Sequence, residues 1–292
     1  MSEQIDLHSW VEKAKSKSTL HNTRTLTWIL LQAVSQSNFL QRSLYLKGGT
    51  LLTLLYHSPR ATKDVDFTTN AEPSAEYLEL LSTELEKELQ RAAIKLKFTQ
   101  LICRVQTAKG MPKNRFPQGE APSAKLTIAM AKRGTSQEES LKQGKGAITL
   151  PVDISFKEVV EDAQELVIQS GQTIQAYTLV DIVAEKLRAV LQQPERNRSR
   201  RQDIFDLSFL IRMGDFDNKE RAQILTSFLV KARSRGIEPT ITSIDNPEVA
   251  ARSKENWLSL AQELSNPLPI FEEEFAAVRK FYVALPWSQA GK

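Results

Sequence analysis

The sequence of 292 residues is 41% hydrophobic and 25% charged, and it carries 39 Lys and Arg against 35 Asp and Glu. These values exclude wholesale disorder, fit one large domain or two, and permit a nucleic-acid partner without requiring one. The single cysteine, Cys103, excludes a disulfide framework, and a polar N-terminus without a long apolar run favours a cytoplasmic protein.

The N-terminal half alternates between helix-like and strand-like segments. Apolar residues at helical spacing predict helices over residues 5–42, 51–56 and 75–93. Alternation of apolar and polar residues predicts strands over residues 44–47, 65–69, 94–105, 125–132 and 148–156. The Pro- and Gly-containing stretch 108–122 predicts a long loop or a broken hairpin.

From about residue 176 onward the patterns are helical. They predict helices over residues 179–191 and 203–212, and further helices over residues 218–287. We therefore predict an α+β fold with a small mixed sheet and flanking helices over residues 1–175. An all-helical C-terminal domain is expected over residues 176–292.

Acidic residues share one face of the predicted strands. Asp64 and Asp66 alternate with Val65 and Phe67, so both carboxylates point to the same side of the sheet. Asp153 falls on the polar side of the strand over residues 148–156 by the same reasoning. Three carboxylates on one face would suit Mg²⁺, which prefers a few oxygen ligands together with water and substrate phosphates. A lone D-x-D more often faces water, so this hypothesis depends on the sequence upstream.

A glycine pair precedes these aspartates. Gly48 and Gly49, followed by Thr50, end a predicted strand and open a predicted helix. Glycine lets the backbone approach an anion closely, and a helix N-terminus offers N–H groups to phosphate. A glycine pair before a helix is usually only a turn, but the combination with D-x-D on the next strand is much more specific.

These segments carry a resemblance to a known family. GGT followed by DVD resembles the signature of the DNA polymerase β nucleotidyltransferase superfamily. The longer segment LYLKGGTLLTLLYHSPRATKDVDF is similar to the GGT…R-x-[ST]-x-D-[LIV]-D-F motif of the AbiEii/AbiGii toxins, which include the MenT-type tRNA-modifying toxins. Downstream, DIVAEKLRAVLQ and RRQDIFDLSFLI resemble the K and D motifs of that family.

The resemblance implies a toxin with a partner antitoxin. It would move a nucleoside monophosphate from an NTP to RNA, with the 3′ end of tRNA as acceptor and pyrophosphate as the second product. The residues implied as magnesium ligands are Asp64, Asp66 and Asp153, with Asp153 alternatively a general base for the acceptor hydroxyl. The residues implied around the nucleotide are Gly48, Gly49, Thr50, Arg60, Thr62 and Lys186. In some family members an antitoxin kinase phosphorylates the position that matches Thr62.

Two charged residues fall on apolar helix faces. Lys186 lies inside the apolar arc of the helix over residues 179–191, so it either extends to solvent or reaches a partner. The K motif of the family falls on Lys186 and favours contact with the triphosphate. Asp203 lies between apolar neighbours, where the resemblance indicates an active-site role in positioning Lys186 or the nucleotide, with Asp206 as the second candidate.

Four arginines crowd the loop between these two helices. They are Arg196, Arg198, Arg200 and Arg201. Such a run is often only a solvated face, but its place between two helices with candidate site residues predicts phosphate contacts with an RNA acceptor. Aromatic residues are not interleaved with them, so a base-stacking platform has no support.

Two alternatives remain open from the sequence. The same chemistry could act on a protein hydroxyl, as AMP transfer. The chain could also be a non-catalytic nucleotide- or RNA-binding module. The intact set of GGT, D-x-D, Asp153 and Lys186 argues against the second alternative.

Overall fold

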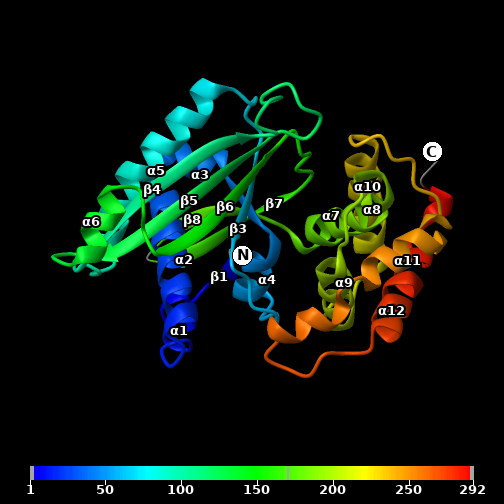
Figure 1. Cartoon of the computed structure of the whole chain (residues 1–292). Helices are drawn as coiled ribbons and strands as arrows, with labels where there is room; N and C mark the ends of the chain where they lie inside the picture. Colours follow the sequence, from blue (N-terminus) through cyan, green and yellow to red (C-terminus); the bar gives the residue numbers. More distant parts are fainter. Residues whose placement is uncertain (1–2, 170, 290–292) are drawn as a thin grey trace. The chain divides into compact units, whose positions relative to one another are not determined.

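The computed structural model describes residues 3–169 and 171–289, which form two compact units (Figure 1). The N-terminal unit contains the residues up to Leu55, Thr62–Glu158 and Ala163–Ala176. The C-terminal unit contains Tyr56–Ala61, Val159–Asp162 and the residues from Tyr177 onward. Two short segments that precede residue 177 therefore belong to the C-terminal unit.

The N-terminal unit is built on a mixed eight-stranded sheet with the order β1-β7-β8-β2-β3-β6-β5-β4. The strands are β1 (Glu3–Gln4), β2 (Tyr45–Lys47), β3 (Val65–Thr69), β4 (Leu101–Met111), β5 (Ser123–Lys132), β6 (Ile148–Phe156), β7 (Ala163–Gln169) and β8 (Gln172–Tyr177). The prediction of a mixed sheet is confirmed, and β3 and β6 have the predicted bounds. The sheet is larger than predicted, because β1, β7 and β8 were not expected.

The register of the central strands places polar and apolar residues on opposite faces. β3 runs parallel to β6, with Val65 opposite Val152 and Asp66 opposite Asp153. Val65 and Val152 are buried, whereas the two aspartates are partly accessible. The alternation read from the sequence is therefore confirmed, because residues in register on neighbouring strands point to the same side.

Among the described residues, six helices accompany this sheet. They are α1 (Leu7–Glu12), α2 (Ser18–Gln36), α3 (Asn38–Ser43), α4 (Gly48–Leu55), α5 (Ala75–Lys95) and α6 (Ser136–Lys142). α2 and α5 pack against each other and against the sheet (Figure 1). The single helix predicted over residues 5–42 is wrong, because Ser37 adopts an extended conformation and its hydroxyl accepts a hydrogen bond from Leu40 N.

The next strand also begins later than predicted. α5 continues to Lys95, and β4 starts only at Leu101, so the strand expected over residues 94–105 is wrong in its first half. β4 then runs through Met111 into the segment expected to be a loop. β4 and β5 pair antiparallel along most of their length, and the connection between them covers residues 112–122.

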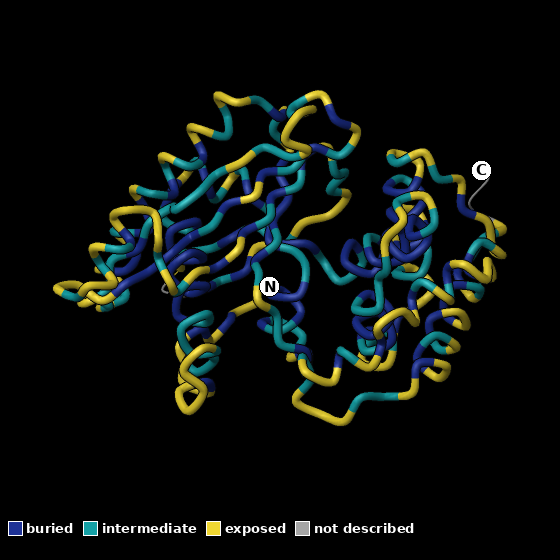
Figure 2. Tube along the Cα trace, viewed as in Figure 1, coloured by how far each residue is buried: buried dark blue, intermediate teal, exposed yellow. Residues whose placement is uncertain are grey.

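The C-terminal unit is helical, as predicted. Its helices are α7 (Leu179–Leu191), α8 (Gln193–Arg196), α9 (Arg201–Met213), α10 (Asn218–Arg233), α11 (Pro247–Lys254) and α12 (Phe271–Val283). α7 has the predicted bounds, and it contacts α9 and α10. Buried residues of these helices include Ile182, Leu207 and Phe228. Figure 2 shows the buried stretches of the chain in dark blue.

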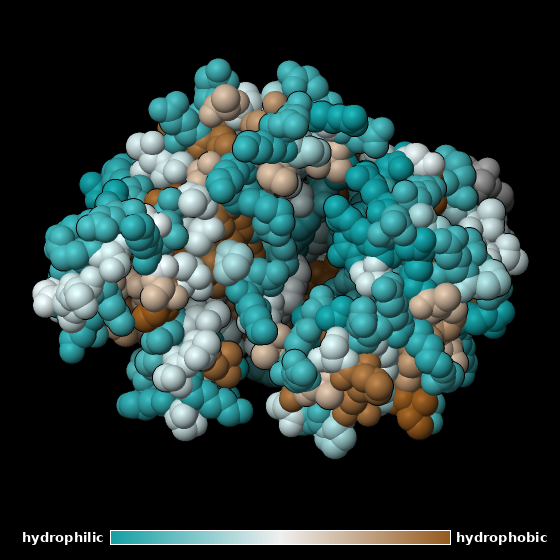
Figure 3. Space-filling model, in the orientation of Figure 1, coloured by the Kyte–Doolittle hydropathy of each residue, from teal (hydrophilic) through white to brown (hydrophobic). Residues whose placement is uncertain are grey.

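The surface is mainly polar. Figure 3 shows hydrophilic side chains over most of the face viewed, with hydrophobic atoms along the lower edge of the C-terminal unit. Exposed large hydrophobic residues of that unit include Leu258 and Ile270. Among the described residues, no helix combines the length and the apolar character needed to cross a bilayer.

Candidate active site

Gly48 and Asp66 are in close contact on the polar face of the sheet. Gly48 is the first residue of α4 and has φ +71°, a left-handed conformation that favours glycine. A Cβ added to Gly48 would lie 2.1 Å from Asp66 Oδ2 and 2.8 Å from Asp66 Cγ. Glycine is therefore required here for its conformation and for the space that the carboxylate occupies.

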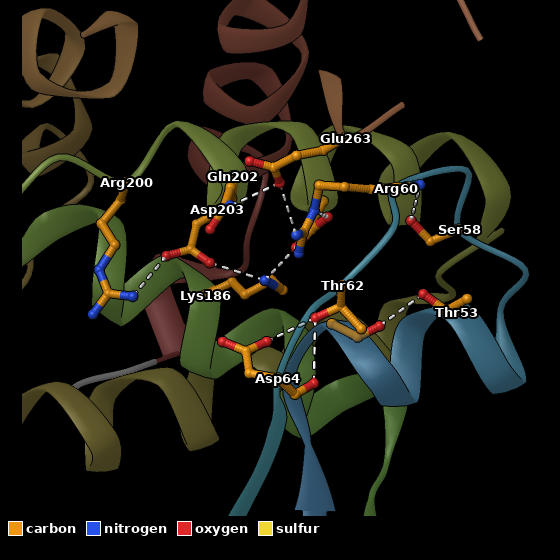
Figure 4. A network of polar contacts seen from close by, with 12 residues as sticks. Thr53, Ser58, Arg60, Thr62, Asp64, Lys186, Arg200, Gln202, Asp203 and Glu263 are labelled. Atoms are coloured by element: carbon orange, nitrogen blue, oxygen red, sulfur yellow. Dashed lines mark hydrogen bonds and ion pairs between the residues drawn. The ribbon is translucent and has the colours of Figure 1, made fainter. Parts of the chain in front are cut away.

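Two hydroxyl groups fix the position of Asp64. Thr50 Oγ1 donates a hydrogen bond of 2.7 Å to the backbone oxygen of Asp64, which ties the first turn of α4 to the start of β3. Thr62 Oγ1 donates a hydrogen bond of 2.8 Å to Asp64 Oδ1 (Figure 4). Within α4, Thr53 Oγ1 donates to Gly49 O. The Asp64 carboxylate is thus oriented by a threonine two residues upstream.

The third predicted carboxylate lies on the neighbouring strand. Asp153 of β6 stands in register with Asp66 on one side and with Lys125 of β5 on the other. Lys125 Nζ lies 3.5 Å from Asp153 Oδ2. The structure thus brings Gly48, Asp66 and Asp153 to one face, next to the Thr50 and Asp64 contact, as the sequence predicts.

Lys47 is a polar residue of this face that sequence reasoning missed. It stands in register with Asp66 across β2 and β3. Lys47 Nζ donates a hydrogen bond of 3.1 Å to Ser155 Oγ and forms an ion pair with Glu158. Its alternation with the buried Leu46 is the signal that could have placed it on the polar side.

Among the described residues, no group of three or more His, Cys, Asp or Glu side chains is arranged as a ready metal site. The ligand set of Asp64, Asp66 and Asp153 therefore stays a prediction. Asp64 and Asp66 still fit a magnesium ion, which proteins often bind through one or two carboxylates plus substrate phosphates.

Adding a single methyl group at Gly48 tests the importance of its contact with Asp66. We expect Gly48→Ala to reduce the nucleotidyl transfer implied by the sequence resemblance about 100-fold, because a carboxylate displaced by about 1 Å loses its working geometry. Gly134→Ala is the matched control, since Gly134 has the same φ of +71° but no atom within 4 Å of the added Cβ. Both variants carry the strain of a left-handed alanine, so equal activities would contradict the role of the Gly48–Asp66 contact.

A buried network of charged residues lies in the C-terminal unit. Lys186 Nζ of α7 is 2.9 Å from Oδ1 of Asp203 on α9 (Figure 4). It is also 2.7 Å from Oδ2 of Asp206 on the same helix. Arg60 donates two hydrogen bonds to Asp206, of 2.9 Å from Nε and 2.7 Å from Nη2. Arg60, Lys186 and Asp203 are each 8% exposed, and Asp206 is fully buried.

The charges of this network stabilise one another. Burial alone would raise the pKa of Asp206, but the Lys186 ammonium and the Arg60 guanidinium lower it to about 2. Burial likewise opposes the charged form of Lys186, and the two aspartates overcome it and raise the pKa of this residue. The interpretation that Lys186 extends to solvent is therefore wrong, and Asp206, rated second from the sequence, holds both cations.

A short backbone contact holds the segment that carries Arg60. Arg60 and Leu264 form an antiparallel bridge, and Ala61 N donates a hydrogen bond of 2.7 Å to Glu263 O. Glu263 Oε2 lies 3.4 Å from Arg60 Nη1 and accepts a hydrogen bond of 2.8 Å from Gln202 Nε2. Glu263 could not be predicted from the sequence, because its partners Gln202 and Arg60 are distant along the chain.

The four arginines predicted to bind RNA lie at the junction of α8 and α9. Arg196 ends α8, Arg198 follows it, and Arg200 and Arg201 are the N-cap and the first residue of α9. Arg198, Arg200 and Arg201 line one pocket together with Ser199 and Gln202. The structure therefore gathers three of the four on one pocket.

A mixed sheet with a glycine at the start of α4, held against an aspartate of the adjacent strand, agrees with the nucleotidyltransferase core that the GGT and DVD motifs lead us to expect. A family-wide sequence comparison matches residues 29–280 to the nucleotidyl transferase AbiEii toxin of type IV toxin–antitoxin systems. The chain belongs to this family and is a nucleotidyltransferase. The family implies an NTP substrate and an antitoxin partner. The comparison with curated proteins found no match.

Solved structures share the fold at low sequence identity. MenT4, a nucleotidyltransferase toxin from Mycobacterium tuberculosis H37Rv, has a TM-score of 0.56 at 18% identity, covering 97% of this chain and 91% of that one. JHP933 from Helicobacter pylori has a TM-score of 0.51 at 16% identity, covering 91% and 90%. A nucleotidyltransferase structure from H. pylori, described as putative, has a TM-score of 0.51 at 12% identity, covering 94% and 99%.

Proposed function

We propose that the chain transfers a nucleoside monophosphate from an NTP to an RNA acceptor, the 3′ end of tRNA, and releases pyrophosphate. The contact between Gly48 and the Asp66 carboxylate carries this proposal. It joins the backbone of a helix N-terminus, which suits phosphate, to an acidic residue that suits a divalent cation. The biological role would be that of a growth-arresting toxin.

The nucleotide phosphates would bind at the first turn of α4. This turn contains Gly48, Gly49 and Thr50, and its N–H groups and positive dipole end favour anions. Lys186 is proposed as a second phosphate contact. Two of the three donors on its ammonium serve Asp203 and Asp206, which leaves the third for a phosphate oxygen. In this proposal, Asp203 positions Lys186. Arg60 contributes indirectly, because it holds the Asp206 carboxylate that also contacts Lys186.

Asp64 and Asp66 would hold Mg²⁺, with Asp153 as a third ligand or as the general base. When bound, Mg²⁺ neutralises phosphate charge and polarises the bond that breaks. The chain's own part is to hold these side chains still, since Thr62 orients the Asp64 carboxylate and Gly48 leaves room for Asp66. As a base, Asp153 would take the proton of the acceptor hydroxyl while the oxygen of that hydroxyl attacks the α-phosphorus of the NTP.

RNA is favoured over a protein acceptor by the arginines at the start of α9. Arg196, Arg198, Arg200 and Arg201 supply four guanidinium groups within six residues of chain, a density suited to a phosphodiester backbone. A protein hydroxyl would need no such run of positive charge. The four arginines are therefore proposed as RNA contacts.

The test is a transfer assay with each of the four α-labelled NTPs in the presence of Mg²⁺. Total tRNA and total protein are offered as separate acceptors. We expect one or more of the nucleotides to label RNA and none to label protein. Label on protein alone would favour AMP-type transfer to a hydroxyl, and tight nucleotide binding without label on either acceptor would favour the non-catalytic module.

A further inference from the structure

An arginine-lined pocket lies within the C-terminal unit. Its volume is about 340 Å³, and its lining residues are Arg198, Ser199, Arg200, Arg201 and Gln202. All five belong to one continuous segment, the turn that leaves α8 and the first residues of α9. We call this cavity the arginine pocket.

The positive charge of the arginine pocket is incompletely balanced. Arg200 Nη1 lies 3.6 Å from Asp203 Oδ2, and Arg201 Nη2 lies 3.6 Å from Glu263 Oε1, both longer than a good hydrogen bond. Arg198 has no carboxylate partner among the residues that the structure describes. Burial and the neighbouring Arg200 and Arg196 lower the pKa of Arg198, as expected where guanidinium groups are held close together.

One donor of the pocket is already desolvated. Arg201 Nε is buried and lacks a hydrogen-bond partner within the described part of the chain. Buried donors without partners destabilise a protein unless a ligand or water satisfies them, so the unpaired Arg201 Nε suits an anion.

The backbone around the pocket is held in place by hydrogen bonds to α8 and α11. Gln193 is 1% exposed, and its Oε1 accepts a hydrogen bond of 2.7 Å from Arg200 N. Gln193 Nε2 donates a hydrogen bond of 2.8 Å to Ser253 Oγ of α11. Asn197, which has φ +47°, accepts a hydrogen bond of 2.9 Å from Arg252 Nη1. The arginines therefore stand on a fixed support, which lowers the entropy cost of binding.

We propose that the arginine pocket binds one phosphate of the acceptor RNA backbone, independently of base sequence. The lining includes no aromatic side chain, so a base has nothing to stack on, whereas guanidinium groups match phosphate oxygens. The choice of RNA as the source of this phosphate rests on the proposed function. The phosphates of a nucleotide are the other source, and the experiment separates the two.

The test measures the affinity of the full chain for a 5′-fluorescein-labelled tRNA at several KCl concentrations, without NTP. We expect Arg198→Gln to weaken binding about 10-fold at low salt and to reduce the slope of log K against log salt by about one. Arg233→Gln is the matched control, because it removes the same charge from an exposed pair with Glu238 in the same unit. It should change the affinity less than 2-fold.

A second arm measures the affinity of the same variants for ATP alone, which Arg198→Gln should leave unchanged. Weaker ATP binding with unchanged tRNA binding would overturn the RNA assignment in favour of nucleotide phosphates. An unchanged salt slope in Arg198→Gln would overturn the pocket proposal while tRNA binding by the unsubstituted chain keeps the proposed function intact. No tRNA binding by the unsubstituted chain would contradict both.

Discussion

Asp66→Asn should reduce nucleotidyl transfer on the order of 1,000-fold, equivalent to about 4 kcal/mol of lost transition-state stabilisation. The asparagine keeps the shape of the side chain against Gly48 but loses the charge that a divalent cation requires. Asp66 is only partly buried, so thermal unfolding should be nearly unchanged. The measurement is the initial rate of label transfer from the preferred NTP.

A carboxylate elsewhere on the same sheet provides the control. Glu165 of β7 is exposed and accepts a hydrogen bond from Gln175 Nε2 of β8. Glu165→Gln removes one negative charge without touching the polar face around Gly48, so its transfer rate should stay within 2-fold of the original. Equal rates for Asp66→Asn and Glu165→Gln would show that Asp66 has no part in the reaction.

Lys186→Met should destabilise the C-terminal unit by about 3–5 kcal/mol. Removing the ammonium leaves Asp203 without its closest cation and Asp206 with Arg60 alone, and an uncompensated buried charge is strongly unfavourable. Amide hydrogen exchange of α7 and α9 reports the stability of this unit directly.

Two further variants make this prediction specific. Lys254→Met removes an exposed lysine that pairs with Glu272 and should change stability by less than about 1 kcal/mol. Lys186→Met combined with Asp203→Asn restores the charge balance and should be more stable than Lys186→Met alone. If Lys186→Met and Lys254→Met lowered the stability of the C-terminal unit equally, the buried network would not stabilise this unit as the structure indicates.

The same network predicts the acid dependence of stability. The folded-state pKa of Asp206 is about 2, below the ordinary 3.8, so its contribution is present above about pH 4. That contribution, about 2 kcal/mol, should be lost as the pH falls from about 4 to about 2. Compared with the unsubstituted chain, Asp206→Asn should therefore be less stable at neutral pH and should lose less stability as the pH falls from about 4 to about 2.

Much of the site's geometry could be predicted because it depends on local periodicity. Asp66 and Asp153 each alternate with buried residues, and only the pairing of β3 with β6 was needed to bring them together. The wheel position of Lys186 also indicated correctly that its side chain lies among apolar residues. The place of Arg60 in this network was harder to predict, because Arg60 and its partner Asp206 are 146 residues apart in the sequence.

The errors in the fold have local causes. α5 was expected to end at Ala93, but it continues to Lys95, and Lys97 takes the left-handed conformation without being glycine, so the usual sign of a helix end was missing. β8 was not predicted, because its accessible positions carry Gln and Thr in a strand of only six residues. Such strands depend on their neighbours in the sheet more than on their own pattern.

The central claim is that the face containing Gly48 and Asp66 moves a nucleotide from an NTP to RNA. It is tested most directly by measuring labelled nucleotide in RNA and pyrophosphate in solution in one reaction. The structure predicts equal molar amounts of the two products, and neither product above background with Asp66→Asn. Labelling of RNA by Asp66→Asn at the original rate, or pyrophosphate release without any labelled RNA, would contradict it.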